Sequence, residues 1–482
     1  MAPRTWPLVA SSRLGVLDEL RVPYAHRGTG PARGWSKLVA AEPAAGLYWP
    51  DGRVRHPAGW FRLDGIPFWG RVARDDDVAG VAAGLDGEWR PQLPILDSRG
   101  ARHASIWRTP AGGTILPFDP DQVIGNYRAE RYGRAAARTG RTPAGGLRRL
   151  YYRARPIVPR PLQIGMRRAY ARVQARTGFP RWPFETALHD LCDLVLAAAA
   201  DAAGRPLPYL SAWPRGRTWS VVLSHDVETA AGRDAIDRVR HVEAEVGLRS
   251  GWNFVPERYR VDDALVAALW AAGHEVGVHG LRHDGRDLES LHTLHRRLPE
   301  IRRWAERWGA VGFRSPATHR VWEWMPILGF EYDSSYPDTD PYEPMPGGCC
   351  SWLPFFNGEM VELPITLAQD HTAFRILRQG ESLWRAKIEL LRERGGMALL
   401  LTHPDYLRDP AMLRSYERIL QDCAADETAW HALPREVSDW WRRRAATSLE
   451  LVDGAWRATG PCNGEAEIRF ALPGAPSSPS FR

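Results

Sequence analysis

Cysteine and lysine are both scarce in this chain of 482 residues. The five cysteines are an odd, scattered set with no Cys-x-x-Cys spacing, which argues against a disulfide framework and against a cysteine-ligated structural zinc site. Only Lys37 and Lys387 are lysines, so arginine provides nearly all of the positive charge. We therefore expect a protein with reduced thiols that is stabilised by its packing.

Long apolar runs are also absent. The longest alanine-leucine run, Leu194 to Ala200, is far shorter than the roughly 20 residues that span a bilayer, so we predict no transmembrane helix. The first residues lack a sustained apolar stretch before a small-residue cleavage site, so we expect no secretory signal and a cytoplasmic location. Hydrophobic residues at 44% and charged residues at 25% exclude a largely disordered, collagen-like or coiled-coil chain.

The positive charge is concentrated in one stretch. Residues 128–181 contain fifteen arginines and one acid, Glu130, which gives +14 there against a net charge of +7 for the whole chain. Such a stretch can hold an anionic polymer, a nucleic acid or an acidic membrane face. Alternatively, its arginines solvate one face of helices and pair with acids elsewhere, which we favour. No recognisable nucleic-acid motif accompanies the stretch, so we expect no nucleic acid partner.

The composition changes along the chain and predicts four segments. Residues 1–125 form an α+β accessory region, residues 126–215 an Arg-rich helical connection, residues 216–445 a catalytic domain, and residues 446–482 a short β-like segment and a disordered tail. The Pro- and Gly-bearing stretch from Gly204 to Pro214 is read as a connection and as the domain boundary.

After Thr218, short apolar strands alternate with helices, as in a parallel α/β sheet. Seven strands with covering helices fit a distorted or incomplete (β/α) barrel, whose strands point their C-terminal ends at the active site. The predicted strands are Trp219–Ser224, Gly251–Val255, Glu275–His279, Val311–Arg314, Phe330–Asp333, Met360–Ile365 and Met397–Thr402.

Metal-competent residues lie where these strands end. The first strand ends in His225, Asp226 and Glu228, and residues two apart on a strand share a face, so the two acids can point into one cavity. Two carboxylates buried together need a compensating cation or proton. His279 and His283 flank a glycine turn after the third strand, and two imidazoles at this spacing can reach one divalent ion.

Five ordered motifs resemble those of the polysaccharide deacetylases, the NodB-homology carbohydrate esterases. They span about Thr218 to Leu407 and read H-D-V-E, H-G-L-R-H, R-S-P, V-E-L-P-I-T and L-L-L-T-H. The resemblance implies a NodB-type barrel and a divalent cation, zinc or a similar ion. It further implies that His279 and His283 are metal ligands, that Arg314 orients the base, and that His403 is the general acid.

The first motif departs from the family pattern of two adjacent aspartates. One alignment makes Asp226 the base and Glu228 the metal ligand; the other puts Asp226 on the metal and His225 at the base position. The first is favoured because the two acids share a strand face. Asp333 is read either as a substrate contact or as a cap of the following turn.

The resemblance implies hydrolysis of an N-acyl group by an activated water. Asp226 takes the proton of the water and His403 protonates the leaving amine. The expected substrate is an N-acetylated amino sugar, a glycan precursor or a small N-acylated metabolite. Two alternatives stay open: hydrolysis of a cyclic amide or ureide, and a degenerate protein that binds carbohydrate or a partner without turnover.

Overall fold

The computed structural model describes residues 15–23, 25–29, 35–39, 45–51, 56–133, 160–175 and 178–474. Within the Arg-rich stretch, residues 134–159 and 176–177 lie outside the described residues. The chain divides into two compact units, each assembled from separate segments. Unit 1 comprises residues 1–4, 136–185 and 216–442, and unit 2 comprises residues 5–135, 186–215 and 443–482. The composition predicts four consecutive segments, whereas the contacts within the chain give two units that each combine separate segments.

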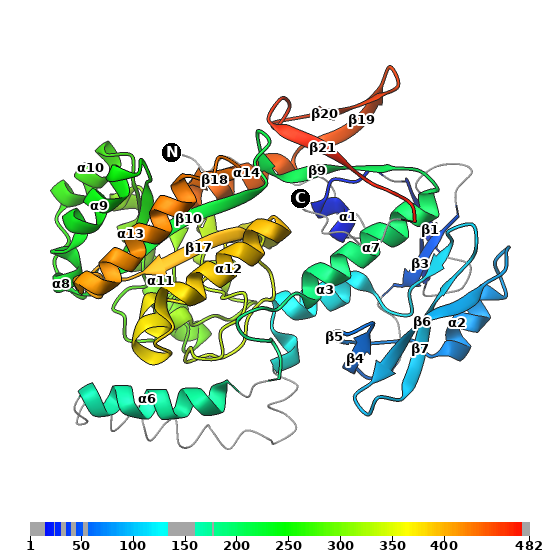
Figure 1. Cartoon of the computed structure of the whole chain (residues 1–482), viewed down its shortest axis with the longest axis horizontal. Helices are drawn as coiled ribbons and strands as arrows, with labels where there is room; N and C mark the ends of the chain where they lie inside the picture. Colours follow the sequence, from blue (N-terminus) through cyan, green and yellow to red (C-terminus); the bar gives the residue numbers. More distant parts are fainter. Residues whose placement is uncertain are drawn as a thin grey trace. The chain divides into compact units, whose positions relative to one another are not determined.

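Unit 1 is built on a curled, mostly parallel sheet (Figure 1). Its strands follow the order β15-β16-β14-β13-β12-β11-β10-β17, with β18 also pairing with β10, and this path of described strands does not close. An incomplete (β/α) barrel, as predicted, is therefore confirmed. The strands are β10 (Trp219–Val227), β11 (Ser250–Phe254), β12 (Glu275–Val278), β13 (Gly312–Phe313), β14 (Tyr332–Asp333), β15 (Phe355–Asn357), β16 (Met360–Glu362), β17 (Met397–Thr402) and β18 (Ala429–Ala432).

Helices alternate with these strands along the chain. Both β10 and β17 consist of buried residues from end to end, as expected for parallel strands that are covered on both faces. The helical elements are α6 (Arg160–Gln174), α8 (Ala230–Arg233), α9 (Ile236–Glu245), α10 (Asp263–Ala271), α11 (Leu291–Trp308), η1 (Pro316–Thr318), η2 (Met325–Leu328), the π-helical η3 (His371–Ile376), α12 (Gly380–Arg394), α13 (Pro410–Ala424) and α14 (Pro434–Ala445), which ends just beyond the unit boundary.

Unit 2 contains a largely antiparallel sheet in the order β1-β2-β3-β8-β7-β6-β4-β5. Its elements from the first half of the chain are α1 (Gly15–Glu19), β1 (Ala25–Thr29), β2 (Trp35–Val39), β3 (Leu47–Pro50), β4 (Gly59–Leu63), β5 (Ile66–Gly70), α2 (Asp75–Ala82), β6 (Arg90–Asp97), β7 (Arg102–Arg108), β8 (Thr114–Ile115), α3 (Pro120–Arg128), α7 (Ala187–Ala203) and β9 (Leu207–Pro214). The C-terminal strands are β19 (Ser448–Val452), β20 (Ala455–Thr459) and β21 (Ala466–Ala471).

Strand β9 corrects the interpretation of residues 204–214 as a connection. All eight residues of β9 are buried, and β9 pairs antiparallel with β21, with Pro208 opposite Phe470 and Pro214 opposite Ala466. Its two prolines resemble loop signals, but β9 pairs with a single described strand, and proline is tolerated where its missing N–H would point away from that partner. Among the described residues, no helix is both long and apolar enough to cross a membrane.

Candidate metal centre

The carboxyl ends of β10, β12, β13 and β17 meet at one point in unit 1. Asp226 and Glu228 come from the end of β10, His279 follows β12, Arg314 follows β13 and His403 follows β17. Because the strands are parallel and adjacent, their ends lie at the same edge of the sheet. The convergence expected from the sequence is therefore present in the fold.

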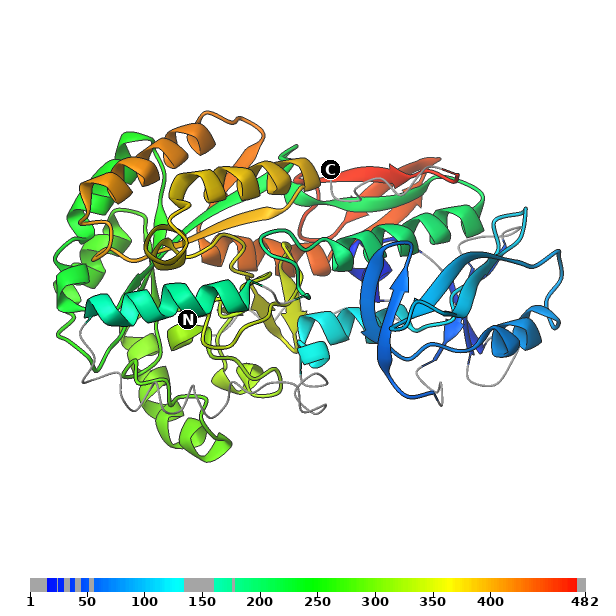
Figure 2. The ribbon, with the colours of Figure 1, turned by 60° about the horizontal axis from the view of Figure 1, so that its bottom comes forward.

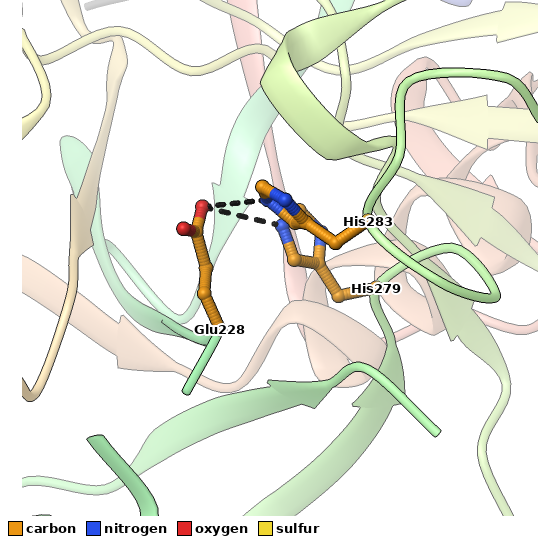
Figure 3. A group of neighbouring side chains, drawn as sticks. All are labelled: Glu228, His279 and His283. Atoms are coloured by element: carbon orange, nitrogen blue, oxygen red, sulfur yellow. Dashed lines mark hydrogen bonds and ion pairs between the residues drawn. The ribbon is translucent and has the colours of Figure 1, made fainter. Parts of the chain in front are cut away.

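Glu228, His279 and His283 form a compact group of three possible ligands. One ligand atom from each lies within 4.8 Å of the other two. Nε2 of His283 lies 2.8 Å from Oε1 of Glu228, and Nε2 of His279 lies 3.8 Å from the same oxygen. Figure 3 shows the carboxylate of Glu228 facing both imidazoles.

His279 fits the role of a metal ligand because only one of its ring nitrogens is satisfied. Nδ1 lies 3.0 Å from the carbonyl oxygen of Arg314, to which it must donate, so Nε2 is the ring nitrogen that can face a metal ion. Nε2 is buried without a hydrogen-bond partner and lies 3.6 Å from Oδ2 of Asp226. A buried ring nitrogen that lies close to two carboxylates without a hydrogen bond is a suitable position for a cation.

His283 is positioned by the loop after β12. It adopts a left-handed backbone conformation with φ of 55°. Gly280, with φ of 62°, begins the loop, and a Cβ atom there would lie 2.5 Å from Oδ2 of Asp287. Asp287 accepts the N–H of Leu281 at 3.0 Å and pairs with Arg297 at 2.7 Å, which fixes the turn.

Two nitrogens and one carboxylate oxygen form a donor set that suits zinc and similar divalent ions. In the structure His283 and Glu228 share a hydrogen bond, and a cation would replace its proton. The residues present therefore fit a divalent cation held by Glu228, His279 and His283.

Asp226 lies beside this group and is held on one oxygen. Its Oδ1 accepts from Nη1 of Arg314 at 3.1 Å and from Nδ2 of Asn253 at 3.0 Å, whereas Oδ2 faces His279. Burial opposes ionisation, but the imidazole of His279 and the guanidinium of Arg314 outweigh it and lower the pKa of Asp226. The carboxylate is thus ionised, with one oxygen directed at the site.

Arg314 is itself fixed from the neighbouring strand end. It is 1% exposed and donates from Nε to the carbonyl oxygen of Ser334 and from Nη2 to Oγ of the same residue, both at 2.7 Å. A guanidinium with this many partners cannot swing away from Asp226. This geometry agrees with the positioning role that the family resemblance implies.

His403, just after β17, also lies beside the group. Its Nε2 lies 3.5 Å from Oε1 of Glu228, and its Nδ1 lies 2.8 Å from Oδ1 of the fully buried Asp370. Burial opposes a charge on the ring, but the carboxylates of Asp370 and Glu228 outweigh it and raise the pKa of His403 well above its ordinary value. For Glu228, burial is outweighed by the three surrounding imidazoles, which hold its pKa well below the ordinary value.

His225 faces away from the site, so it does not occupy the base position of the competing alignment. Its Nε2 lies 2.6 Å from Glu243 and its Nδ1 lies 2.7 Å from Oγ1 of Thr402, and the ring is stacked on Trp252. The alternation of side chains along β10 explains this orientation, since adjacent residues point to opposite faces.

Asp333 also lies outside the group of possible ligands. It is fully buried, and its Oδ1 accepts the hydroxyl of Ser335 at 2.7 Å; that hydroxyl oxygen in turn accepts the N–H of Ser315 at 2.9 Å. The residue therefore braces the loop that follows Arg314, which agrees with a capping role.

Sequence reasoning missed Asn253 and Asp370. Asn253 is an amide inside an otherwise apolar strand, opposite Asp226 in the register of β10 and β11, and this is a usable signal. Gly277 leaves room for it, because a Cβ atom there would lie 2.2 Å from Oδ1 of Asn253. Asp370 lies in A-Q-D-H-T, which contains no recognisable motif, and only the fold brings it to His403.

No protein-family model matches the chain. No curated protein matches its sequence. Among solved structures, the chain is similar to a protein from Mycobacterium smegmatis assigned as a polysaccharide deacetylase, with 20% identity and a TM-score of 0.40 over 48% of this chain and 92% of the other. An allantoinase shows 17% identity and a TM-score of 0.39, with the same coverage of both chains.

A family 4 carbohydrate esterase from Streptomyces lividans, solved in complex with acetate, shows 15% identity and a TM-score of 0.29 over 44% of this chain and 91% of the other. The comparisons thus return polysaccharide deacetylases, the family that the five motifs resemble.

Proposed function

We propose that this chain is a metal-dependent hydrolase of carbon–nitrogen bonds that removes an N-acyl group, in the first instance N-acetyl, from an amino sugar or glycan precursor. The observation that supports this proposal most directly is that an ionised carboxylate and a protonated imidazole lie next to one group of possible metal ligands. Asp226 is ionised through Arg314 and His403 is protonated through Asp370, and both lie next to the group of Glu228, His279 and His283.

These protonation states suit a base and an acid in one reaction. Oδ2 of Asp226 is the oxygen left free by Arg314 and Asn253, so it accepts the proton of the attacking water. Nε2 of His403 donates its proton to the leaving nitrogen, while Nδ1 remains bound to Asp370. A bound divalent cation lowers the pKa of water and polarises the acyl carbonyl. The products are an amine and a carboxylate.

The cation would be held by Glu228, His279 and His283, with zinc as the first ion to test. Asp226 is kept as the base and not as a fourth ligand, because Arg314 and Asn253 already bind one of its oxygens. The glutamate in place of the family's aspartate is one methylene longer, which brings its carboxylate to the imidazoles from a position just beyond the end of β10.

The test combines metal analysis with product release. Purified wild-type protein and His279→Ala are compared for bound zinc after reconstitution, and acetate release is followed on a panel of N-acetylated sugars. Stoichiometric zinc and acetate release in the wild type only would support the proposal. A wild type that cannot be reconstituted would support a degenerate binding protein, and ring opening of cyclic ureides without acetate release would support the ureide hydrolase.

A further inference from the structure

Helix α6 (Arg160–Gln174) has one side bound to unit 1. Ala171 is buried in a cluster with Tyr342 and Ile376. Nε and Nη2 of Arg168 donate to the carbonyl oxygen of Arg375 at 2.9 and 2.8 Å. Figures 1 and 2 both show α6 at the periphery of this unit. The helix is therefore a fixed surface element of unit 1.

The other side of α6 exposes large apolar side chains to solvent. Met166, Tyr170 and Val173 are 51%, 47% and 59% exposed. Their spacing of four and three residues places them in one stripe along the helix, on the side away from Ala171. Single exposed hydrophobic residues are ordinary, but a contiguous stripe on a helix that is already anchored indicates a contact surface.

Arginine borders this stripe. The helix contains four arginines and no acid, and it lies within the stretch of residues 128–181 whose net charge is +14. Arg172 is exposed next to Val173, and Arg167, next to Met166, is half-buried. Long basic side chains beside an apolar stripe are typical of helices that lie in the interface of an anionic bilayer.

We propose that the exposed face of α6 docks unit 1 on an anionic lipid surface. In this arrangement Met166, Tyr170 and Val173 enter the boundary between headgroups and acyl chains, and the guanidinium groups bind lipid phosphates. A nucleic acid or another soluble polyanion would match the arginines but leave the apolar stripe in water. An apolar protein surface would cover the stripe but leave the charge unmatched. The proposal does not depend on the proposed hydrolase function.

The first experiment is sedimentation of the full-length protein with vesicles. Binding is expected to vesicles of phosphatidylglycerol and phosphatidylcholine, to fall steeply with added salt, and to be absent for phosphatidylcholine alone. The triple variant Met166→Ser, Tyr170→Ser, Val173→Ser should bind at least about tenfold more weakly. Arg172→Gln should weaken binding about fivefold. The matched control Leu291→Ser, another exposed apolar residue of unit 1 at 39%, should bind as the wild type does.

A second measurement reports insertion directly and does not rely on lost binding. All five native cysteines are buried, so Val173→Cys can be labelled selectively with a polarity-sensitive dye. Its emission should shift to the blue with anionic vesicles but not with neutral ones, and Leu291→Cys should show no shift.

Several outcomes would overturn the proposal. These are no vesicle binding by the wild type, unchanged binding by the triple variant, or equal binding to soluble polyanions such as polyphosphate or DNA. A change of oligomeric state in the triple variant with no change in vesicle binding would instead assign the stripe to a second copy of the chain.

Discussion

Polar residues on the two faces of strand β10 differ in how completely they are hydrogen-bonded. On one face His225 is bound on both ring nitrogens, and its partner Glu243 also accepts the hydroxyls of Ser250 and Tyr416 at 2.6 and 2.8 Å. On the other face Asp226 lies beside Nε2 of His279, which is buried without a hydrogen-bond partner. We call the face with His225 and Glu243, whose polar groups are hydrogen-bonded, the closed face, and the face with Asp226 and His279 the open face. Hydrogen-bonded groups stabilise the fold, whereas a buried nitrogen without a hydrogen bond can bind a ligand. This contrast separates structural from functional polar groups more clearly than residue type does.

The largest effect should come from the open face. Asp226→Asn preserves shape but cannot accept a proton, so turnover should fall by at least about 10³-fold. The zinc content should stay at the wild-type level, because the three proposed ligands are untouched. Acetate release and metal analysis on the same preparation check this. Loss of zinc in Asp226→Asn would instead make Asp226 a ligand.

On the closed face, Glu243→Ala should act on stability and not on the cation. Removing the carboxylate leaves Nε2 of His225 and the hydroxyl of Tyr416 without this buried acceptor and takes one partner from the hydroxyl of Ser250. The free energy of unfolding should fall by about 3–5 kcal/mol. Urea denaturation measures the loss, and the zinc stoichiometry of the folded fraction serves as the control. If Glu243→Ala lost zinc but kept its stability, the structural role assigned to Glu243 would be contradicted.

Zinc should stabilise the folded protein only by binding to Glu228, His279 and His283. Adding zinc to chelator-treated wild-type protein at about 100 times its dissociation constant should stabilise the fold by about 2.7 kcal/mol, because the ion binds the native state alone. The shift in thermal midpoint measures it, and His279→Ala should show none. A zinc-induced shift that survives in His279→Ala would point to another site.

The smallest effect concerns the acid. Asp370 raises the pKa of His403, so Asp370→Asn should lower that pKa. Because His403 acts in its protonated form, activity is lost as pH rises through its pKa, and the alkaline limb of the pH–rate profile should move to lower pH. Turnover should fall about tenfold on the alkaline side of the profile. An alkaline limb that does not move would remove His403 from the acid role.

Much of unit 1 could be predicted because its strands are buried apolar runs with clear ends. The limits of β17 match the predicted strand Met397–Thr402 residue for residue. Strands β13 and β14 are only two residues long, because the chain turns at once to place Arg314 and Ser334. Those turns depend on tertiary hydrogen bonds that no local pattern contains.

In the candidate site, too, residues in local motifs could be predicted, whereas residues that depend on tertiary contacts could not. Residues inside motifs, such as Glu228, His279 and His283, were found, since two acids or two imidazoles at short spacing indicate metal chemistry on their own. Asp370 was not, because a lone aspartate becomes informative only after folding brings it 2.8 Å from a histidine 33 residues away. Strand β9 was missed for a related reason: its partner β21 lies more than two hundred residues further along the chain.

That pairing of β9 with β21 also bears on biosynthesis. A ribosome delivers Leu207–Pro214 long before Ala466–Ala471, and the whole sheet of unit 1 emerges in between. The ladder of β9 and β21 can therefore form only after every described strand of the unit 1 sheet has been synthesised. Truncation before Ala466 for recombinant expression would leave β9 without its partner in this ladder.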